Sequence, residues 1–338
     1  MQFHFTEEQQ AFADSVRRFA LAHLEKGALK RAHDPRYPFD VAKLMSAQGL
    51  MGISLPEADG GQGGTLMDAV IAIEQVAAVC PRSSDVVQFG NFGPIRTFAE
   101  YGTPQQKARW LPDLLQGRMV MSLGITEPDA GSAATDLKTS AKPDGSHYVI
   151  NGSKLFSSFS PDAAIFLIYV RYGPGLGGIG SVIVERGAPG FAIGQPSRFM
   201  SGEEWCELHF DNCRIPAENV LLGPGGFKKQ MAGFNIERLG NTARSLAFGR
   251  YAFNKAREHC NGNSPTWRSS SKARSFCSTA RRPMPTAVCP PPTKPPSPRP
   301  PATRRASRLR AKRSRSWAPL AIARRAWWNG ACGVAAAG

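Results

Sequence analysis

Apolar residues in the first 118 positions recur at helical spacing. Thr6 and Gln9 have the spacing of a capping box, and Phe12, Val16 and Phe19 follow at intervals of three or four residues. Further helices are predicted at residues 41–51, 66–80 and 105–115. We therefore predict an N-terminal helical domain over residues 1–118.

The pattern changes near Met119. Short runs rich in Val, Ile, Tyr and Phe, separated by Gly, Pro and Asn turns, indicate antiparallel strands joined by tight turns. The predicted strands include residues 148–150, 165–172, 181–185 and 207–210. Residues 119–224 are therefore predicted to form a middle antiparallel β domain.

A long helix is predicted after the glycine-rich turn at residues 223–226. One face of it, which extends to about Cys260, contains Leu239, Ala243, Leu246, Ala247 and Tyr251. We predict an α+β multidomain protein in which residues 225–260 form the first helix of a C-terminal helical domain.

Composition separates the last 78 residues from the rest. Residues 261–338 contain 16 Lys and Arg and no Asp or Glu, so they carry the whole formal net charge of +16. They also hold 12 of the 27 prolines, which oppose helix and sheet. We predict a disordered, basic, Pro-rich tail at 261–338. A basic tail is an alternative nucleic-acid-binding element, but we expect no nucleic-acid partner.

Several classes of protein are not indicated by residues 1–260. Their four cysteines form no Cys-x-x-Cys pair and the histidines are scattered, so neither a metal site nor a disulfide framework is expected. The charged N-terminus does not resemble a secretory signal. The longest apolar run, residues 163–170, is too short to span a bilayer. We expect a cytoplasmic protein without a membrane span.

Two segments have the composition of a ligand-binding site. Residues 123–132 combine Thr126, a Pro-Asp turn and small residues, which lets backbone N–H groups approach a planar polar ligand or a phosphate. Alone, this segment is more consistent with a plain loop. In the second segment Phe156 is followed by Ser157 and Ser158, after the turn at residues 151–152.

In this order, between helical regions, the two segments resemble the acyl-CoA dehydrogenase family over about residues 3–260. Segments 55–63, 102–112 and 215–221 add to the resemblance. It implies FAD bound between the β domain and a C-terminal four-helix bundle. It also implies oxidation of an acyl-CoA thioester to trans-2-enoyl-CoA, in which a carboxylate removes the α-proton and the β-hydrogen leaves as hydride to the flavin. The resemblance further implies an electron-transfer flavoprotein-like acceptor and a homo-oligomer.

The resemblance also implies site residues. FAD would be held by Leu123, Ile125, Thr126 and Ser132 and by Phe156, Ser157 and Ser158. Ser132 would also face the acyl-CoA, together with Asn235 and Arg238. Ala133 departs from the family, which often has Asp there.

Glu237 is the candidate catalytic base, because some members place the catalytic Glu at the start of this helix. Most members use a Glu close to the C-terminus instead. An acid near a helix start can also serve the helix dipole alone, so these alternatives stay open.

The family continues beyond Cys260 with an Arg-x-x-Phe-Gly-like element and further helices, none of which this sequence contains. A reading-frame shift of one base permits family-like helical sequence over residues 261–304 and 317–333. We therefore predict a deletion and frameshift near Cys260 that leaves an incomplete C-terminal bundle. FAD binding, activity and oligomerisation would then be impaired. The alternatives are a non-catalytic protein with a nucleic-acid-binding tail, or a related flavin oxidase or monooxygenase. The nucleotide sequence around the Cys260 codon tests the frameshift.

Overall fold

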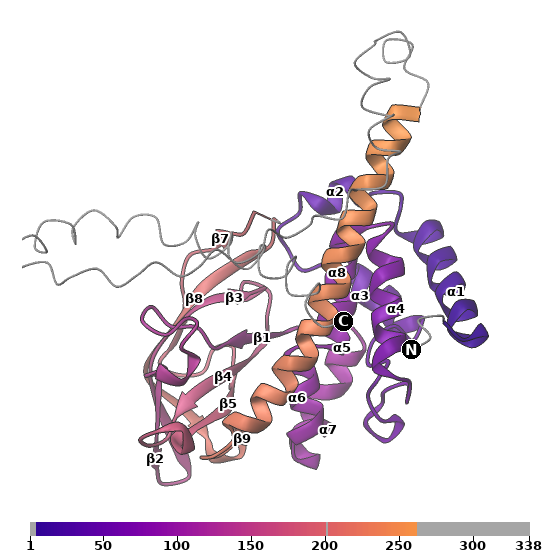
Figure 1. Cartoon of the computed structure of the whole chain (residues 1–338). Helices are drawn as coiled ribbons and strands as arrows, with labels where there is room; N and C mark the ends of the chain where they lie inside the picture. Colours follow the sequence, from indigo (N-terminus) through magenta and orange to yellow (C-terminus); the bar gives the residue numbers. More distant parts are fainter. Residues whose placement is uncertain (1–4, 201, 262–338) are drawn as a thin grey trace, which may run out of the picture. The chain divides into compact units, whose positions relative to one another are not determined.

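The computed structural model describes residues 5–200 and 202–261, and its N-terminal part is helical as expected. The first helix, α1 (Glu7–His23), begins after Thr6, whose side chain accepts from the Gln9 N–H while the Gln9 side chain accepts from the Thr6 N–H. This is the predicted capping box. The other helices of this part are α2 (Ala28–Ala32), α3 (Phe39–Ala47), α4 (Leu66–Ala77), α5 (Ser84–Asn91), α6 (Pro94–Tyr101) and α7 (Pro104–Leu115) (Figure 1).

Apolar spacing indicated α1, α3, α4 and α7 but not α5 and α6. In α5 both polar and apolar side chains are buried, among them Asp85, Gln88 and Asn91. Both α5 and α6 have eight residues, so each offers few positions at which an apolar repeat can be recognised. The sequence pattern therefore did not identify these two short helices.

The middle part is a sheet, as predicted. Its strands are β1 (Met121–Gly124), β2 (Ser140–Asp144), β3 (His147–Ser158), β4 (Ile165–Arg171), β5 (Ile179–Glu185), β6 (Phe191–Ile193), β7 (Ser197–Arg198), β8 (Glu204–Pro216) and β9 (Val220–Leu222). The order is β6-β8-β3-β2-β4-β5-β9, with β1 also beside β4 and β7 beside β8.

Most neighbouring strands are antiparallel, but β1 and β4 are parallel in the register Met121↔Ile165 to Gly124↔Ile168. Their parallel direction corrects the expectation of antiparallel strands alone. The β2–β3 hairpin lies between them in the chain, so β4 can return in the direction of β1. As a result, the loop after β1 begins beside the C-terminal half of β4, where Gly124 is paired with Ile168.

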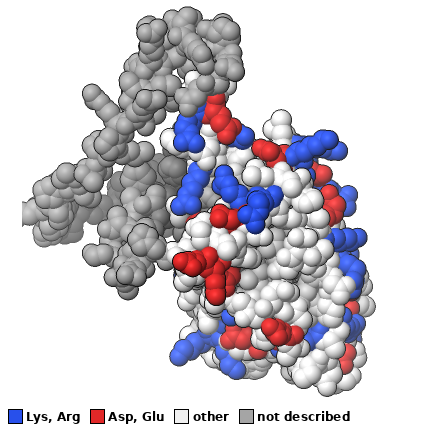
Figure 2. Space-filling model, turned by 90° about the vertical axis from the view of Figure 1, so that its right-hand side faces the viewer, with Lys and Arg blue, Asp and Glu red and all other residues white. Residues whose placement is uncertain are grey.

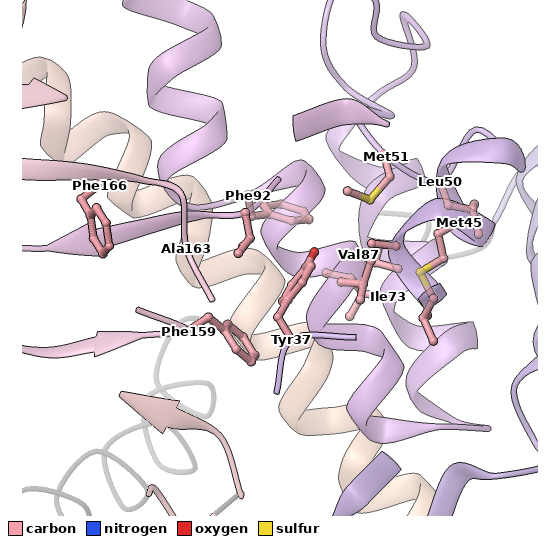
Figure 3. Packing of buried hydrophobic residues seen from close by; sticks show 14 of the residues in the cluster. Tyr37, Met45, Leu50, Met51, Ile73, Val87, Phe92, Phe159, Ala163 and Phe166 are labelled. Atoms are coloured by element: carbon pink, nitrogen blue, oxygen red, sulfur yellow. The ribbon is translucent and has the colours of Figure 1, made fainter. Parts of the chain in front are cut away.

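Buried apolar side chains join the helices to the sheet. Tyr37 and Phe159 pack edge to face with ring centroids 5.2 Å apart (Figure 3). The Phe89 ring lies 4.9 Å from the Phe159 ring. A second cluster contains Phe98 and Tyr169. Because these clusters contain residues of both parts, the chain up to Arg257 forms one compact unit.

After the sheet, α8 (Phe227–Asn261) packs on the N-terminal helices through small residues. A Cβ atom on Gly240 would lie 2.9 Å from the Phe92 ring, and Ala243 and Ala247 are buried. The apolar face expected from the sequence is thus divided, because only small side chains permit this close approach. Its large members point outward. We name the exposed residues Leu239, Leu246 and Phe253 the α8 stripe.

Acidic and basic side chains are interspersed on the face of the molecule shown in Figure 2, with broad uncharged areas between them. No helix within the described residues is long and apolar enough to cross a membrane. Apart from Asn261, the predicted disordered tail and the predicted frameshifted segment lie outside the described residues.

Candidate active site

The two segments chosen from the sequence lie against each other. The Leu155 N–H donates to the Thr126 carbonyl at 2.8 Å, and the Ser157 hydroxyl donates to the Leu123 carbonyl at 3.0 Å. The Ser122 hydroxyl donates to the Ser158 carbonyl at 2.8 Å. These bonds join the loop after β1 to the end of β3, although about 30 residues separate them in the chain.

Phe156 presents an aromatic surface beside this junction. Its side chain is 43% exposed, and its backbone has a left-handed φ of 58°. Such a φ is uncommon for an aromatic residue and is often found at functional sites. The Phe156 ring packs on Trp205 at 4.6 Å between centroids and lies 6.4 Å from Phe199. Three rings from separate strands and loops therefore support one exposed aromatic face.

The hydroxyl groups of the two segments differ in their availability. Ser157 is buried and its hydroxyl is engaged with Leu123, so it ties the two segments together. Among the described residues, the hydroxyls of Thr126 and Ser158 have no hydrogen-bond partner, and Ser132 is exposed. Free hydroxyls beside an exposed aromatic face match what a planar heteroaromatic cofactor needs, namely a stacking surface and polar contacts at its edge.

Three of the residues around this junction were not identified from the sequence. Lys154 and Glu127 form a buried ion pair under the loop, and Trp205 supports Phe156 from β8. Glu127 lies in the first of the two segments selected from the sequence and Lys154 in the second. An acid in one segment and a base in the other could have indicated an ion pair between them. No sequence signal connected Trp205 to Phe156, because their proximity depends on the pairing of β3 with β8.

Glu237 lies on the side of α8 that faces the N-terminal helices. A Cβ atom on Gly93, the residue before α6, would lie 3.6 Å from the Glu237 carboxyl carbon. Burial raises the pKa of Glu237 to about 7, against a smaller lowering by Arg244. A carboxyl group with this pKa can exchange protons near neutral pH, as a general base requires.

The Glu237 charge also acts on the sheet. Burial and then the charge of Glu237 raise the pKa of the Tyr169 phenol. Tyr169 belongs to β4, the strand that pairs with β1. The candidate base is therefore electrostatically coupled to a neighbour of the strand from which the candidate cofactor loop continues.

Asn235 and Arg238 lie on the exposed side of α8 instead. The Arg238 guanidinium donates to the Asn235 side-chain oxygen at 3.1 Å and stacks over the Phe234 ring at 5.0 Å. Ile236, between them, lines a groove of about 590 Å³ that also includes Arg96 and Lys107. The structure therefore places the two predicted substrate contacts together, but on a different side of the helix from Glu237.

A buried ionic network lies next to Glu237 along α8. Asp85 accepts from Arg82 at 2.9 Å and from Arg244, and Glu203 lies 3.9 and 3.6 Å from the same two guanidinium groups. Burial and the Asp85 charge raise the pKa of Glu203 to about 7, although both arginines oppose the shift. The network joins α5, the segment before β8 and α8.

A metal site was not expected from the sequence. Within residues 5–200 and 202–261, no group of three or more His, Cys, Asp or Glu side chains is arranged to hold a metal ion.

Two family models match the chain. The acyl-CoA dehydrogenase N-terminal domain matches residues 6–118, and the acyl-CoA dehydrogenase middle domain matches residues 122–213. Together these matches cover more than half of the chain and follow the division into a helical part and a sheet.

Individual relatives agree with these models. An acryloyl-CoA reductase (NADH) from Anaerotignum propionicum is 36% identical over 259 residues, which are 75% of this chain and 66% of the relative. The structure of butyryl-CoA dehydrogenase from Megasphaera elsdenii is 27% identical with a TM-score of 0.73, covering 83% of this chain and 75% of that one. A glutaryl-CoA dehydrogenase from Mycobacterium smegmatis in complex with FADH2 is 25% identical with a TM-score of 0.68, covering 74% of this chain and 64% of that one.

The chain spans about two thirds of the length of the curated relatives it matches. The shares are 66%, 68% and 70% for three of them. Part of each relative therefore has no counterpart in the matched region of this chain.

Proposed function

The chain belongs to the acyl-CoA dehydrogenase family. We propose that it descends from a flavin-dependent enzyme that oxidises an acyl-CoA thioester to trans-2-enoyl-CoA. The observation that carries this proposal is Glu237, a carboxyl group with a pKa of about 7 on the side of α8 that faces the N-terminal helices. An acid with that pKa suits removal of the α-proton of a thioester.

The cofactor of the proposed reaction is FAD. The residues proposed to hold it are Phe156, through its exposed ring, and Thr126 and Ser158, through their free hydroxyls. Leu123 and Ile125 would contribute backbone groups, whereas Ser157 would act by joining the two segments. The chemistry that FAD supplies when bound is acceptance of the hydride that leaves the β-carbon.

Glu237 takes up the α-proton in this proposal. Burial makes its neutral form more stable than in water, so the carboxylate is driven to accept a proton. Arg244, which lowers the pKa of Glu237, keeps a useful fraction of it deprotonated at neutral pH. Ser132, Asn235 and Arg238 are proposed to contact the acyl-CoA, because they are exposed and polar.

We also propose that FAD binding and turnover are weakened in this chain. The support is the composition of residues 261–338, which contain no Asp or Glu and from which the frameshift after Cys260 is predicted. An electron-transfer flavoprotein-like acceptor would reoxidise the flavin. The family resemblance implies a homo-oligomer, and we propose that oligomerisation is also weakened in this chain.

The test uses the full chain with excess FAD. Flavin uptake is measured by quenching of flavin fluorescence, and reduction is followed as anaerobic loss of the yellow absorbance after addition of butyryl-CoA. We expect slow reduction in the wild type, no reduction in Glu237→Gln, and wild-type behaviour in the control Glu8→Gln, which removes an exposed acid from α1.

Each part of the proposal has its own contrary result. A Glu237→Gln variant that is reduced at the wild-type rate contradicts the role of Glu237 as base. A wild-type chain that takes up no FAD contradicts the flavin site. Full flavin content with rapid turnover contradicts the proposed impairment, and rapid reoxidation by oxygen favours a flavin oxidase or monooxygenase.

A further inference from the structure

A buried pair of opposite charges lies directly beneath the loop at residues 123–132. The Lys154 ammonium is 2.7 Å from a Glu127 carboxylate oxygen, and both side chains are withdrawn from solvent. A buried ion pair gives little net stability compared with apolar side chains of similar volume. The groups that this ion pair holds in place therefore indicate its role.

Glu127 connects the loop to the backbone of residues 138–139 and to the Lys154 side chain. Its carboxylate accepts from the Lys138 N–H at 2.6 Å, from the Thr139 N–H at 2.9 Å and from Lys154. Its own N–H and carbonyl are bonded to Ala130, at 3.1 and 3.2 Å. Burial would raise the pKa of Glu127, but Lys154 and the donated hydrogen bonds hold it below its ordinary value. Glu127 therefore stays ionised and anchors the lysine.

Lys154 reaches the loop because residue 124 is glycine. A Cβ atom on Gly124 would lie 3.1 Å from Lys154 Cγ and 2.7 Å from Ile168 Cδ1, both too close. The lysine stem runs through this space, and Lys154 Nζ donates to the Ile125 carbonyl at 3.2 Å. Gly124 thus leaves space for the Lys154 side chain, whose ammonium group lies under the Ile125–Thr126 peptide group.

The Ile125 carbonyl belongs to the same peptide group as the Thr126 N–H. A cation bonded to the carbonyl oxygen withdraws electron density from that peptide, and hydrogen bonds polarise one another in a low-dielectric interior. The Thr126 N–H therefore becomes a stronger donor on the outer side of the loop, where the free Thr126 hydroxyl also lies.

We propose that Lys154, anchored by Glu127, is a positioning residue that fixes this loop and polarises the Ile125–Thr126 peptide towards an acceptor atom of the bound flavin. This inference rests on the proposed function. Lys154 acts through the peptide group and contacts no ligand itself. Loss of its charge should therefore weaken flavin binding more than its effect on folding explains.

The test compares Lys154→Met with two control variants of the full chain. Lys142→Met removes an exposed lysine from β2, and Val182→Ala truncates a buried side chain of β5 that lies outside this loop. FAD is titrated by fluorescence quenching, and stability is measured by urea unfolding. We expect Lys154→Met to raise the dissociation constant for FAD severalfold above that of either control variant, because it removes the charge that polarises the Ile125–Thr126 peptide.

A second measurement needs no cofactor. In protein labelled with 15N at threonine, the Thr126 amide signal is assigned by its disappearance in Thr126→Ser. We expect its proton resonance to move upfield in Lys154→Met and to stay in place in Lys142→Met and Val182→Ala, because only the first removes the charge from the adjacent carbonyl.

Two outcomes overturn the inference. One is an FAD affinity of Lys154→Met equal to that of Lys142→Met. The same conclusion follows if Lys154→Met and Val182→Ala lose equal free energy of unfolding and bind FAD equally well. The other is an unchanged Thr126 amide resonance. If the wild type binds no FAD, the proposed function fails, and the amide resonance alone still decides whether Lys154 polarises the peptide.

Discussion

Replacing Asp85 by asparagine should destabilise the fold far more than removing an acid that faces solvent. The Asp85 carboxylate is buried and accepts from Arg82 at 2.9 Å and from Arg244 on α8. The substitution keeps the shape of the side chain but removes the charge that two guanidinium groups share. These cations would retain Glu203, at 3.9 and 3.6 Å, the charge of Glu237 near Arg244, and three backbone carbonyls that accept from Arg82.

The expected magnitude follows from burial. Removing one partner of a buried ion pair costs about 3–5 kcal/mol, because the other charge stays desolvated. Glu203 moderates the loss, since burial and then the charge of Asp85 raise its pKa to about 7. Without Asp85 it ionises more readily and compensates part of the cation charge. We therefore expect a loss near the lower limit, about 3 kcal/mol.

Glu74→Gln is the matched control, because it also pairs an acid of the N-terminal helices with an arginine of α8. The Glu74–Arg250 distance is 3.0 Å, but the arginine side chain is 63% exposed. A pair of this kind contributes about 1 kcal/mol or less.

Urea unfolding of the full chain at neutral pH, followed by far-ultraviolet circular dichroism, gives the free energy of unfolding for the wild type and both variants. The reasoning fails if Asp85→Asn loses no more free energy than Glu74→Gln. Equal large losses in both variants would show that burial does not decide the strength of these pairs.

Three further predictions concern Glu237, Gly117 and Leu246. Because the pKa of Glu237 is raised by burial from 4.5 to about 7, the folded protein keeps a proton that the unfolded chain loses. The free energy of unfolding should therefore fall as the pH rises from about 4.5 to 7. In urea titrations Glu237→Gln should remove up to about 3 kcal/mol of that fall. A variant with the same pH dependence as the wild type would contradict the raised pKa. Gly117→Ala should lower the free energy of unfolding by more than Gly145→Ala, since both have a positive φ but only a Cβ on Gly117 meets backbone, 2.5 Å from the Ala42 carbonyl carbon; equal losses would exclude the steric part. Leu246 is 56% exposed in the α8 stripe, so Leu246→Gln should reduce concentration-dependent self-association in analytical ultracentrifugation, and unchanged association would show that the stripe does not cause it.

Much of the fold follows from local sequence patterns. The Thr6 capping box and the periodic apolar positions of α4 and α7 depend on residues three or four apart, and the structure confirms these helices. Short Val- and Ile-rich runs separated by turns likewise predicted the sheet. Such interactions are readable because all partners lie within a few residues of one another.

The same local reading misjudged α8 and did not find α5. Leu239, Ala243, Leu246, Ala247 and Tyr251 were predicted to share one face of α8, but only the two alanines among them are buried, whereas both leucines are exposed. Hydrophobicity alone favours the leucines, whereas the distance between the packed helices admits only small side chains. That distance is set by the neighbouring helices, not by α8.

The two candidate segments at residues 123–132 and 151–158 could be selected from the sequence, because their composition is unusual. Their resemblance to acyl-CoA dehydrogenases also led to the family that the comparisons confirm. The roles of Glu237 and of the individual flavin contacts remain proposals. Their residue types alone could not separate the engaged Ser157 from the free Ser158.

From the sequence follow several of the helices, the sheet, the family and the separation of the basic residues 261–338 from a neutral remainder. Only the folded chain shows which side chains are buried together, such as Lys154 with Glu127 and Asp85 with Arg244. The physical reason is that the charge and pKa of such groups depend on desolvation and on partners tens of residues away. A sequence pattern extends over a few residues, whereas burial is a property of the whole packed chain.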